Sequence, residues 1–301
     1  MDSLNTIGVA PLRLTAFIGI FVLMALLELA IPRRTPGQGK GTRWFTNLMI
    51  AGIGSLVLRL MAMLAVPIAA FATALWAQSQ GWGLLNWLNS SPSWPGWPEV
   101  FFAMLVLDLA VYGQHVVSHK IPLLWRLHKV HHTDVDFDVT TAVRFHPVEI
   151  ALSMLWKIAV ILIIGASPAA VLLFEVTLNG CAMFNHANIA LPLWLDRLVR
   201  ALIVTPDMHR VHHSIHPSEH DSNYGFNLSL WDRLFRTYTA QPRDGHLAMT
   251  IGQKNHLDEN PKNLIWSLML PFRQTKRDSD QKKASGGQKK LSGDQKKLSG
   301  K

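Results

Sequence analysis

The sequence predicts an all-α integral membrane protein with three transmembrane helices, a helical hairpin and a cytoplasmic helical cap rich in histidine. Composition is the first observation behind this class: the 301 residues are 49% hydrophobic and only 16% charged, whereas soluble domains average about 25% charged residues. The second is that the apolar residues lie in long runs, and a transmembrane helix needs about 20 mainly apolar residues. Together these observations argue against a soluble protein.

Three apolar runs have the length of a transmembrane helix, and they cover residues 12–32, 48–76 and 100–117. A fourth apolar region, residues 150–184, is too long for one span and has the sequence Gly-Ala-Ser-Pro near its middle. Because glycine and proline interrupt helices, we expect a helical hairpin there. Its arms are short, so the hairpin is not required to cross the membrane fully.

The charges of the loops predict how the chain is oriented. The loop from Arg33 to Arg43 contains four Lys or Arg and no acid, whereas residues 77–98 contain four Trp and no Lys or Arg. Positive loops stay in the cytoplasm and Trp gathers at membrane interfaces. Residues 115–149 are therefore expected on the cytoplasmic side, and a hairpin at 150–184 would return the following residues to the same side.

Three histidine clusters are the strongest functional signal. Residues 128–132 and 209–213 both read H-x-x-H-H, and residues 115–119 read H-x-x-x-H; together they hold eight of the fourteen histidines. Positions i, i+3 and i+4 share one helix face, so each cluster is expected to point its imidazoles the same way. Neutral imidazole is the commonest metal ligand, and eight suit two metals. The ligands predicted in this way are His115, His119, His128, His131, His132, His209, His212 and His213.

Other residue types limit the kind of metal site. Cys181 is the only cysteine, which excludes an internal disulfide and a cysteine-based zinc site. Imidazole suits iron, zinc and copper, so the sequence leaves zinc open. Two closed structural zinc sites are one alternative, although such sites usually use cysteine. The other alternative is a set of surface histidines near lipid head groups, which the repetition of the pattern disfavours.

Further residues are predicted to complete the site. His186, in Asn-His-Ala-Asn, is expected to be a ninth metal ligand, and His146, before Pro147, is expected to support the ligands from behind or to pack. Asp108 shares a helical stripe with His115 and would orient it by accepting its second N–H; a pair with Arg59 is the alternative. The remaining histidines are expected at the surface, namely His216, His220, His246 and His256.

The order of these motifs resembles the fatty acid hydroxylase and sterol desaturase superfamily. The resemblance covers about residues 100–240 and includes R-F-H-P-x-E at 144–149, D-S-N-Y-G at 221–225 and W-D-R-L-F at 231–235. It implies a diiron centre held mainly by the eight clustered histidines, with His186 as a further match. Some relatives have histidines where this chain has Cys181 and Asn185, so one metal is expected to have fewer protein ligands.

The resemblance also implies a function. Members use O2 and electrons to hydroxylate, desaturate or cleave a sterol, fatty acyl or ether lipid taken from the bilayer. Since no electron-transfer domain is recognisable in the sequence, a separate electron-donor protein is expected. The alternative is a non-redox zinc-binding membrane protein or hydrolase, for which Glu149 and Glu219 would be the nearest general bases.

The chain divides into four predicted parts: transmembrane helices and loops in 1–98, the catalytic domain in 99–240, an extension of the cap in 241–273 and a tail in 274–301. The tail repeats a Lys-rich heptad with a net charge of +6 and too few apolar residues for a core, so a disordered, solvated tail is expected. Electrostatic adhesion to anionic lipid head groups is the alternative. Without interleaved aromatic residues the tail gives no reason to expect nucleic-acid binding. No Lys or Arg precedes Arg13, which disfavours a cleaved signal peptide, and a bacterial inner membrane is the expected location.

Overall fold

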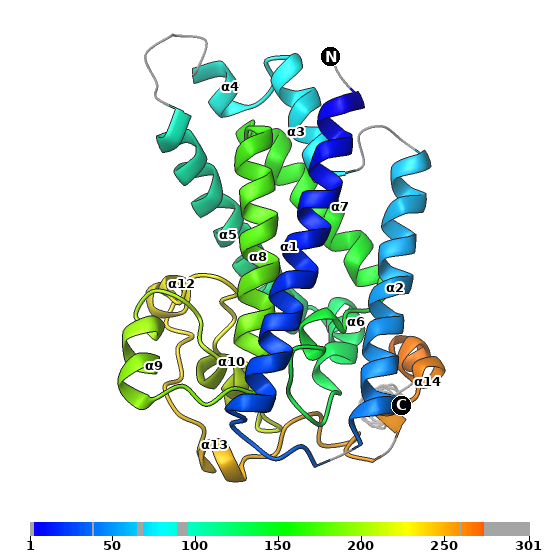
Figure 1. Cartoon of the computed structure of the whole chain (residues 1–301), viewed down its shortest axis with the longest axis vertical. Coiled ribbons are helices and arrows are strands. Elements are labelled where there is room, and N and C mark those ends of the chain that lie inside the picture. Colours follow the sequence, from blue (N-terminus) through cyan, green and yellow to red (C-terminus); the bar gives the residue numbers. More distant parts are fainter. Residues whose placement is uncertain (1–2, 38, 65–68, 89–95, 259, 274–301) are drawn as a thin grey trace, which may run out of the picture.

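The structure is a computed structural model that describes residues 3–37, 39–64, 69–88, 96–258 and 260–273. Within these residues the chain forms helices joined by loops, with isolated backbone bridges but no strands (Figure 1). Five described helices are long and apolar enough to cross a membrane, so the all-helical membrane class is confirmed. These helices are α1 (Ser3–Ala30), α2 (Lys40–Leu64), α5 (Gly96–Lys120), α7 (Pro147–Ile164) and α8 (Pro168–His186).

Helices α7 and α8 form the hairpin that the sequence predicts. Gly165 ends α7 with a left-handed φ of 67°, a conformation that favours glycine. Ser167 caps α8 by accepting the N–H of Ala170, and Pro168 follows at the first helical position, where its missing N–H is harmless. The arms have 18 and 19 residues, about 27 Å at 1.5 Å per residue, so each is long enough to span.

The second predicted helix has different bounds in the structure. The apolar run 48–76 is divided between α2, which begins at Lys40 and ends at Leu64, and a separate helix α3 (Ala70–Ser79). A further short helix, α4 (Leu84–Leu88), lies in the region expected to be a loop. Hydropathy does not distinguish one long span from a span followed by a helix that packs against protein, because both bury apolar side chains.

The segment containing α3 and α4 covers the turn of the hairpin (Figure 1). Gly83 has a φ of +98°, and a Cβ added there would lie 2.4 Å from the Cα of Gly165. The backbones can approach this closely only because both residues lack a side chain. Glu99, in the first turn of α5, accepts hydrogen bonds from the N–H and the Oγ of Ser167. The hairpin turn is thereby held by α5 as well as by the α3–α4 segment.

Helices α3, α5, α7 and α8 pack together through one apolar core in the upper part of the bundle. Leu107 of α5, Ile161 of α7 and Phe174 of α8 are fully or almost fully buried in it. Between transmembrane helices such cores stabilise through van der Waals packing, because lipid tails are as apolar as the side chains. Helix α1 packs on the outside of α8 and remains largely exposed to the surroundings.

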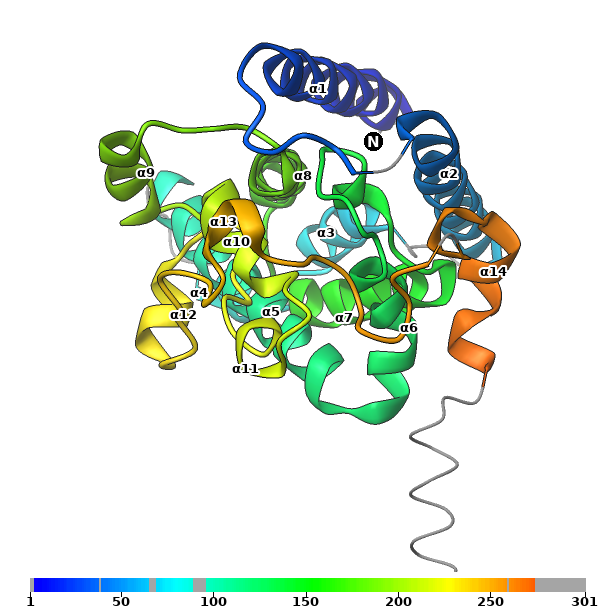
Figure 2. The same ribbon diagram turned by 90° about the horizontal axis from the view of Figure 1, so that it is seen from below.

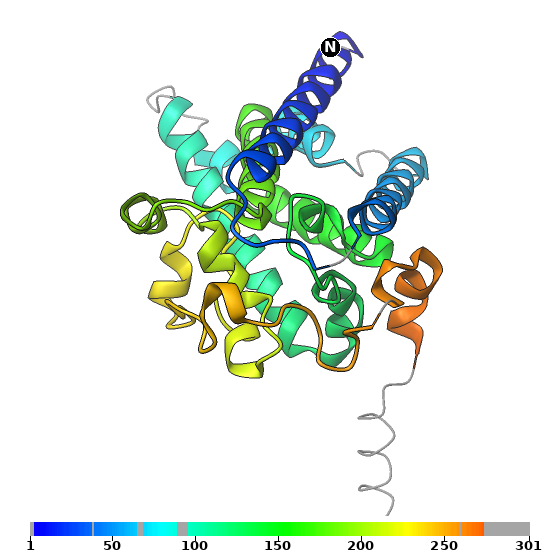
Figure 3. The same ribbon diagram turned by 60° about the horizontal axis from the view of Figure 1, so that its bottom comes forward.

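The opposite end of the bundle carries a cap of short helices (Figures 2 and 3). The hairpin returns the chain to this end, so that the ends of α5 and α8 meet α6 and α10 there. The cap elements are α6 (Pro122–His132), η1 (Thr141–Val143), α9 (Leu193–Arg200), α10 (Pro206–His212), α11 (Pro217–His220), α12 (Leu230–Leu234), α13 (Gly245–Ala248), η2 (Asn260–Lys262), α14 (Leu264–Met269) and η3 (Leu270–Phe272).

Two buried arginines fasten the cap to the bundle. Arg43, expected in a loop, lies in α2 and forms ion pairs with Asp134, at 2.9 Å, and with Asp138. Arg144 donates to the carbonyl of Val130 at 2.9 Å and to the Oδ1 of Asn47 at 2.6 Å, and burial lowers its pKa to about 10. The cap and α2 are therefore joined by hydrogen bonds that leave little freedom between them.

The predicted division into four parts stays a prediction. Residues 241–273 contain α13, η2, α14 and η3, and α14 packs against α2. The Lys-rich tail, 274–301, lies outside the described residues.

Candidate metal centre

The structure brings all nine predicted ligands together inside the cap, although they come from four helices. His115 and His119 lie in the last two turns of α5, and His186 ends α8. The others lie on α6 and α10, with His213 as the C-cap of α10. All nine are buried.

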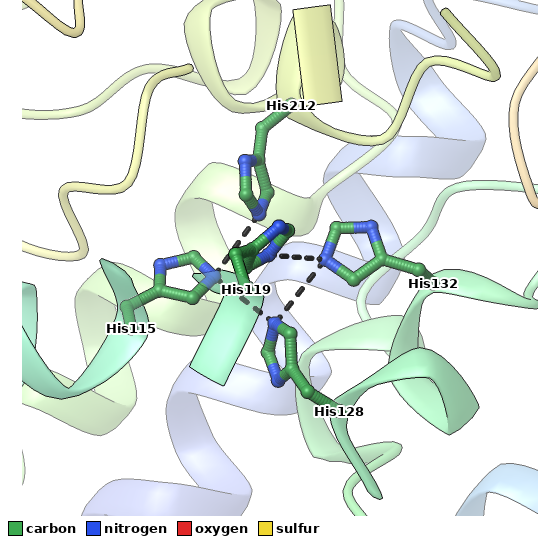
Figure 4. A group of neighbouring side chains, drawn as sticks. All are labelled: His115, His119, His128, His132 and His212. Atoms are coloured by element: carbon green, nitrogen blue, oxygen red, sulfur yellow. Dashed lines mark hydrogen bonds between the residues drawn. The ribbon is translucent and has the colours of Figure 1, made fainter. Parts of the chain in front are cut away.

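The nine histidines form two groups whose ring nitrogens converge. The group of five contains His115, His119, His128, His132 and His212 (Figure 4). The group of four contains His131, His186, His209 and His213. Within each group one ring nitrogen of every member lies within 4.8 Å of those of the others. The group of four is the one that contains His186, which ends α8.

Each H-x-x-H-H motif contributes to both groups, which differs from the expectation that one cluster points all its imidazoles the same way. In the first motif, His128 and His132 join the group of five and His131 the group of four; in the second, His209 and His213 join the group of four and His212 the other. The reason is helical geometry. At 3.6 residues per turn, i+3 and i+4 lie on opposite sides of i and diverge by about 100°.

Backbone and carboxylate acceptors orient four of the rings. The Nδ1 of His115 lies 2.6 Å from the carbonyl of Tyr224, and that of His212 lies 2.7 Å from the carbonyl of Ser222. The Nδ1 of His186 lies 2.8 Å from the carbonyl of Ala182, and the Nδ1 of His128 lies 2.6 Å from Oε1 of Glu149. Since carbonyl and carboxylate oxygens only accept, each Nδ1 carries the proton, and each Nε2 of a neutral ring presents a lone pair.

These lone pairs point at one another, which is the arrangement that a cation requires. The Nε2 atom of His115 lies 3.0 Å from that of His212 and 3.1 Å from that of His128. In neutral rings these contacts would bring lone pairs together without a proton between them. Two ligands at right angles around one ion, with bonds of about 2.1 Å, lie about 3.0 Å apart, so the donor set fits a metal ion.

The protonation state of the cap histidines also suits metal binding. Burial, followed by the charge of neighbouring histidines, lowers the pKa well below the ordinary value of 6.5 in five histidines of the cap, namely His131, His132, His209, His212 and His213. Neutral rings are the form that ligates. Several ring nitrogens are buried without a hydrogen-bond partner, including both nitrogens of His213.

The carboxylate that supports His128 is Glu149, and the role predicted for Asp108 is wrong. Asp108 accepts hydrogen bonds from the indole N–H of Trp231 at 2.8 Å and from the backbone N–H of Leu228, so it fastens the cap to α5. It serves neither His115, whose acceptor is a carbonyl, nor Arg59. Glu149 follows His146-Pro147 in the R-F-H-P-x-E motif and lies in the first turn of α7. Its place in this motif is the sequence signal that could have predicted its role.

His146 is a helix cap and does not support the ligands. Its Nδ1 accepts the backbone N–H of Val148 at 3.2 Å, and its Nε2 lies 3.2 Å from the carbonyl of Leu268. An acceptor at this position satisfies an N–H that the first helical turn leaves unpaired. His146 therefore positions Glu149 only by starting the helix on which Glu149 lies.

The loop that contains Ser222 and Tyr224 supplies two of the carbonyls that orient histidine rings. The spacing of the histidines did not identify this loop as functional. Asp232 accepts the N–H groups of Tyr224 and Gly225, both at 2.8 Å, and the hydroxyl of Thr237 at 2.7 Å. Asn223, at a φ of +53°, donates to the carbonyls of Met208 and Thr239. These bonds hold the loop so that its carbonyls face the rings. The D-S-N-Y-G sequence thus supplies the carbonyls that orient His115 and His212, and the W-D sequence holds that loop in place.

The remaining histidines are not all at the surface. His246 is buried, with its Nε2 3.7 Å from Asp207, which corrects the surface expectation. His220 is largely buried and stacks on Trp125, with ring centroids 5.2 Å apart. His216 is more accessible and pairs with Asp244 at 2.7 Å, and His256 is half-buried against a tryptophan.

A cavity of about 420 Å³ runs from the histidines into the membrane-spanning part of the bundle. His115, His128 and Glu149 line the end at the cap, and the walls come from α1, α2, α5, α7 and α8. Small residues of α2, among them Ala51 and Gly54, line one side. A cavity of this size is typical of small-molecule sites. The cavity is therefore large enough to hold a small molecule beside the group of five.

Fold and site together define an all-helical membrane protein with buried histidine clusters suited to metal. Residues 100–237 match the fatty acid hydroxylase family, and this part of the chain is similar to the members of that family. The resemblance inferred from the sequence is therefore confirmed.

Named relatives extend the match. The chain is 24% identical over 279 residues to an ornithine lipid hydroxylase of Rhizobium tropici, covering 87% of this chain and 76% of that protein. It is 27% identical to an alkylglycerol monooxygenase of Xenopus tropicalis over 73% of this chain and 46% of that protein. It is 26% identical to a human cholesterol 25-hydroxylase over 51% of this chain and 59% of that protein. The chain thus spans only about half of the latter two proteins. No solved structure matches significantly.

Proposed function

We propose that this protein is a diiron, O2-dependent lipid hydroxylase. The observation that carries the proposal is the convergence of two groups of buried histidines at the cap end of a cavity that extends between the long apolar helices. The named relatives are hydroxylases or monooxygenases, which favours hydroxylation over desaturation. In such a reaction one oxygen atom of O2 becomes the new hydroxyl group and the other leaves as water, with two electrons and two protons supplied by a donor.

The nine histidines would hold two iron ions, one in each group. Iron supplies the redox chemistry needed to break an unactivated C–H bond, which no side chain provides. The chain itself binds, orients and shields. Glu149 and the carbonyls of Ser222 and Tyr224 keep the protons of their histidines on Nδ1, which directs the lone pairs inward. The cavity places hydrocarbon beside His115 and His128 and keeps bulk water away.

The location and the electron donor are part of the proposal. The cap would lie on the cytoplasmic face, because Arg33 and Arg34 adjoin it, whereas exposed Trp82, Trp87 and Trp97 lie at the opposite end. A separate electron-donor protein on that face would supply the two electrons. A bacterial inner membrane stays a prediction from the sequence.

Metal analysis combined with turnover tests the function. The protein loaded with iron should contain about two irons per chain and hydroxylate a bilayer lipid only with O2 and a reductant. His186→Ala removes one member of the group of four and should reduce the iron content to about one per chain and abolish turnover. His216→Ala, which removes a histidine outside both groups, should leave both quantities unchanged.

The zinc hydrolase alternative makes opposite predictions. A stoichiometric zinc content together with turnover that does not depend on O2 would refute the hydroxylase proposal. Glu149 is the acid nearest the site, but its Oε1 is engaged by His128 at 2.6 Å, so it has no free role as a general base through that atom.

A further inference from the structure

A cluster of three charged side chains lies in the same cavity, away from the histidines. Glu175 of α8 forms an ion pair with Lys157 of α7 at 3.0 Å and with Arg13 of α1 at 2.9 Å. All three residues line the cavity. They come from helices that are long and apolar enough to cross a membrane, which would place the cluster at membrane depth.

We propose that this charged cluster binds the anionic head group of an amphiphilic substrate, such as a carboxylate, so that the hydrocarbon tail extends toward the histidines. The inference rests on the proposed lipid hydroxylase function and names the substrate class and its orientation. The charged cluster is defined by Arg13, Lys157 and Glu175.

The charge count of the cluster supports an anionic ligand. Two cations surround one carboxylate, which leaves a net charge of +1. Lys157 has three N–H donors and Arg13 five, and a single carboxylate does not satisfy them. The Lys157 side chain is only 15% exposed and that of Glu175 4%. A membrane helix tolerates ionisable groups where they pair or serve a pathway, and one cation would suffice to pair with Glu175.

The position of the cluster fits a molecule that enters with its tail toward the cap. Lys157 follows Glu149 by eight residues on α7, which is about 12 Å along the helix axis at 1.5 Å per residue. Glu149 contacts His128, so the cluster and the group of five face the same cavity across about two helical turns. On α7, Ile150 and Met154 lie between Glu149 and Lys157 and line the cavity, and both suit hydrocarbon.

Arg13 also gives the cluster access to lipid. Its side chain is 38% exposed, and α1 lies on the outside of the bundle (Figure 1). Long basic side chains extend toward polar surroundings while their stems stay among apolar groups. Arg13 can therefore contact a head group arriving from the bilayer while Lys157 contacts it within the cavity. The tail carbons, and not the head group, then lie nearest the histidines.

Binding of radiolabelled palmitate and of cetyl alcohol tests the proposal. The metal-loaded protein in nanodiscs of neutral lipid is measured without O2 and reductant, so that binding is independent of turnover. Lys157→Met lowers the net charge of the cluster to zero and should weaken palmitate binding about tenfold or more, with cetyl alcohol nearly unchanged. Lys157→Arg keeps the positive charge and should bind palmitate about as tightly as the wild type. Arg59→Met, which removes an exposed membrane-helix cation outside the cavity lining, is the matched control and should change neither ligand.

Glu175→Gln separates ligand binding from a structural role. The variant raises the net charge to +2, so palmitate binding should be retained or strengthened. If the cluster only locks α1 to the hairpin, Glu175→Gln and Lys157→Met should both lower the melting temperature and weaken both ligands equally, and that result would overturn the proposal. Unchanged palmitate binding in Lys157→Met would overturn it as well. In either case iron content and O2-dependent turnover of the wild type would still decide the proposed function separately.

Discussion

Glu149 offers the most direct test of how the protein tunes its metal centre. Its Oε1 lies 2.6 Å from the Nδ1 of His128, and both side chains are buried. A hydrogen bond to a charged group contributes about 1.5–3 kcal/mol, which corresponds to about 10- to 150-fold in binding. Partners behind a ligating histidine typically affect metal affinity about 10- to 100-fold. In the proposed diiron centre, Glu149→Ala should therefore weaken the binding of one iron by at least about tenfold.

The effect should be confined to the group of five, because His128 belongs to that group alone. Titration with a chelator should release one iron early in Glu149→Ala and leave the other as in the wild type. Glu149→Gln keeps a neutral acceptor and should give an intermediate affinity. Glu99→Gln changes another buried acid, at the hairpin turn, and serves as the control. Wild-type retention of both irons by Glu149→Ala would refute the assignment of this role.

Three further outcomes are expected. Asp232→Ala should release the loop that holds the carbonyl of Tyr224 and lower the iron content, because two N–H groups lose their acceptor. Gly83→Ala should lower the melting temperature more than Gly81→Ala: both have positive φ, but only a Cβ at Gly83 meets backbone. Burial lowers the pKa of His246 to about 4, so the folded protein binds fewer protons there than the unfolded chain. The stability that this residue contributes above about pH 6.5 is therefore lost as the pH falls toward 4.

Each of these outcomes has its own control. Asp258→Ala removes an exposed acid and should leave the iron content unchanged, and equal iron in both Asp variants would contradict the role of the loop. Equal melting temperatures for the two glycine variants would show that the backbone at the hairpin turn moves to make room for the added Cβ without loss of stability. For the third, His246→Gln should show a smaller loss of melting temperature between pH 6.5 and 4 than the wild type. A parallel pH profile would exclude a contribution from this histidine.

Prediction of the fold succeeded where the signal was local. The Gly-Ala-Ser-Pro sequence at 165–168 located the hairpin, because a left-handed glycine and a capping serine act over a few residues. The bounds of α2 and α3 were not predictable, since hydropathy records that residues 48–76 are apolar but not what they pack against. Arg43 likewise reads as a loop charge, although its partners Asp134 and Asp138 lie about ninety residues further along the chain.

The sequence by itself determined which residues are candidates for the centre: the spacing of the histidines selected eight members of the two groups, and the Asn-His-Ala-Asn sequence added His186. Only the tertiary structure decided how they are shared, because side chains three and four apart on a helix diverge and their partners come from other helices. The same holds for the supporting groups. Asp108 shares a stripe with His115, yet the carbonyl of Tyr224 lies closer to that ring. Every residue has a backbone carbonyl, so the sequence does not indicate which carbonyls orient the rings, and only the fold brings them to the site.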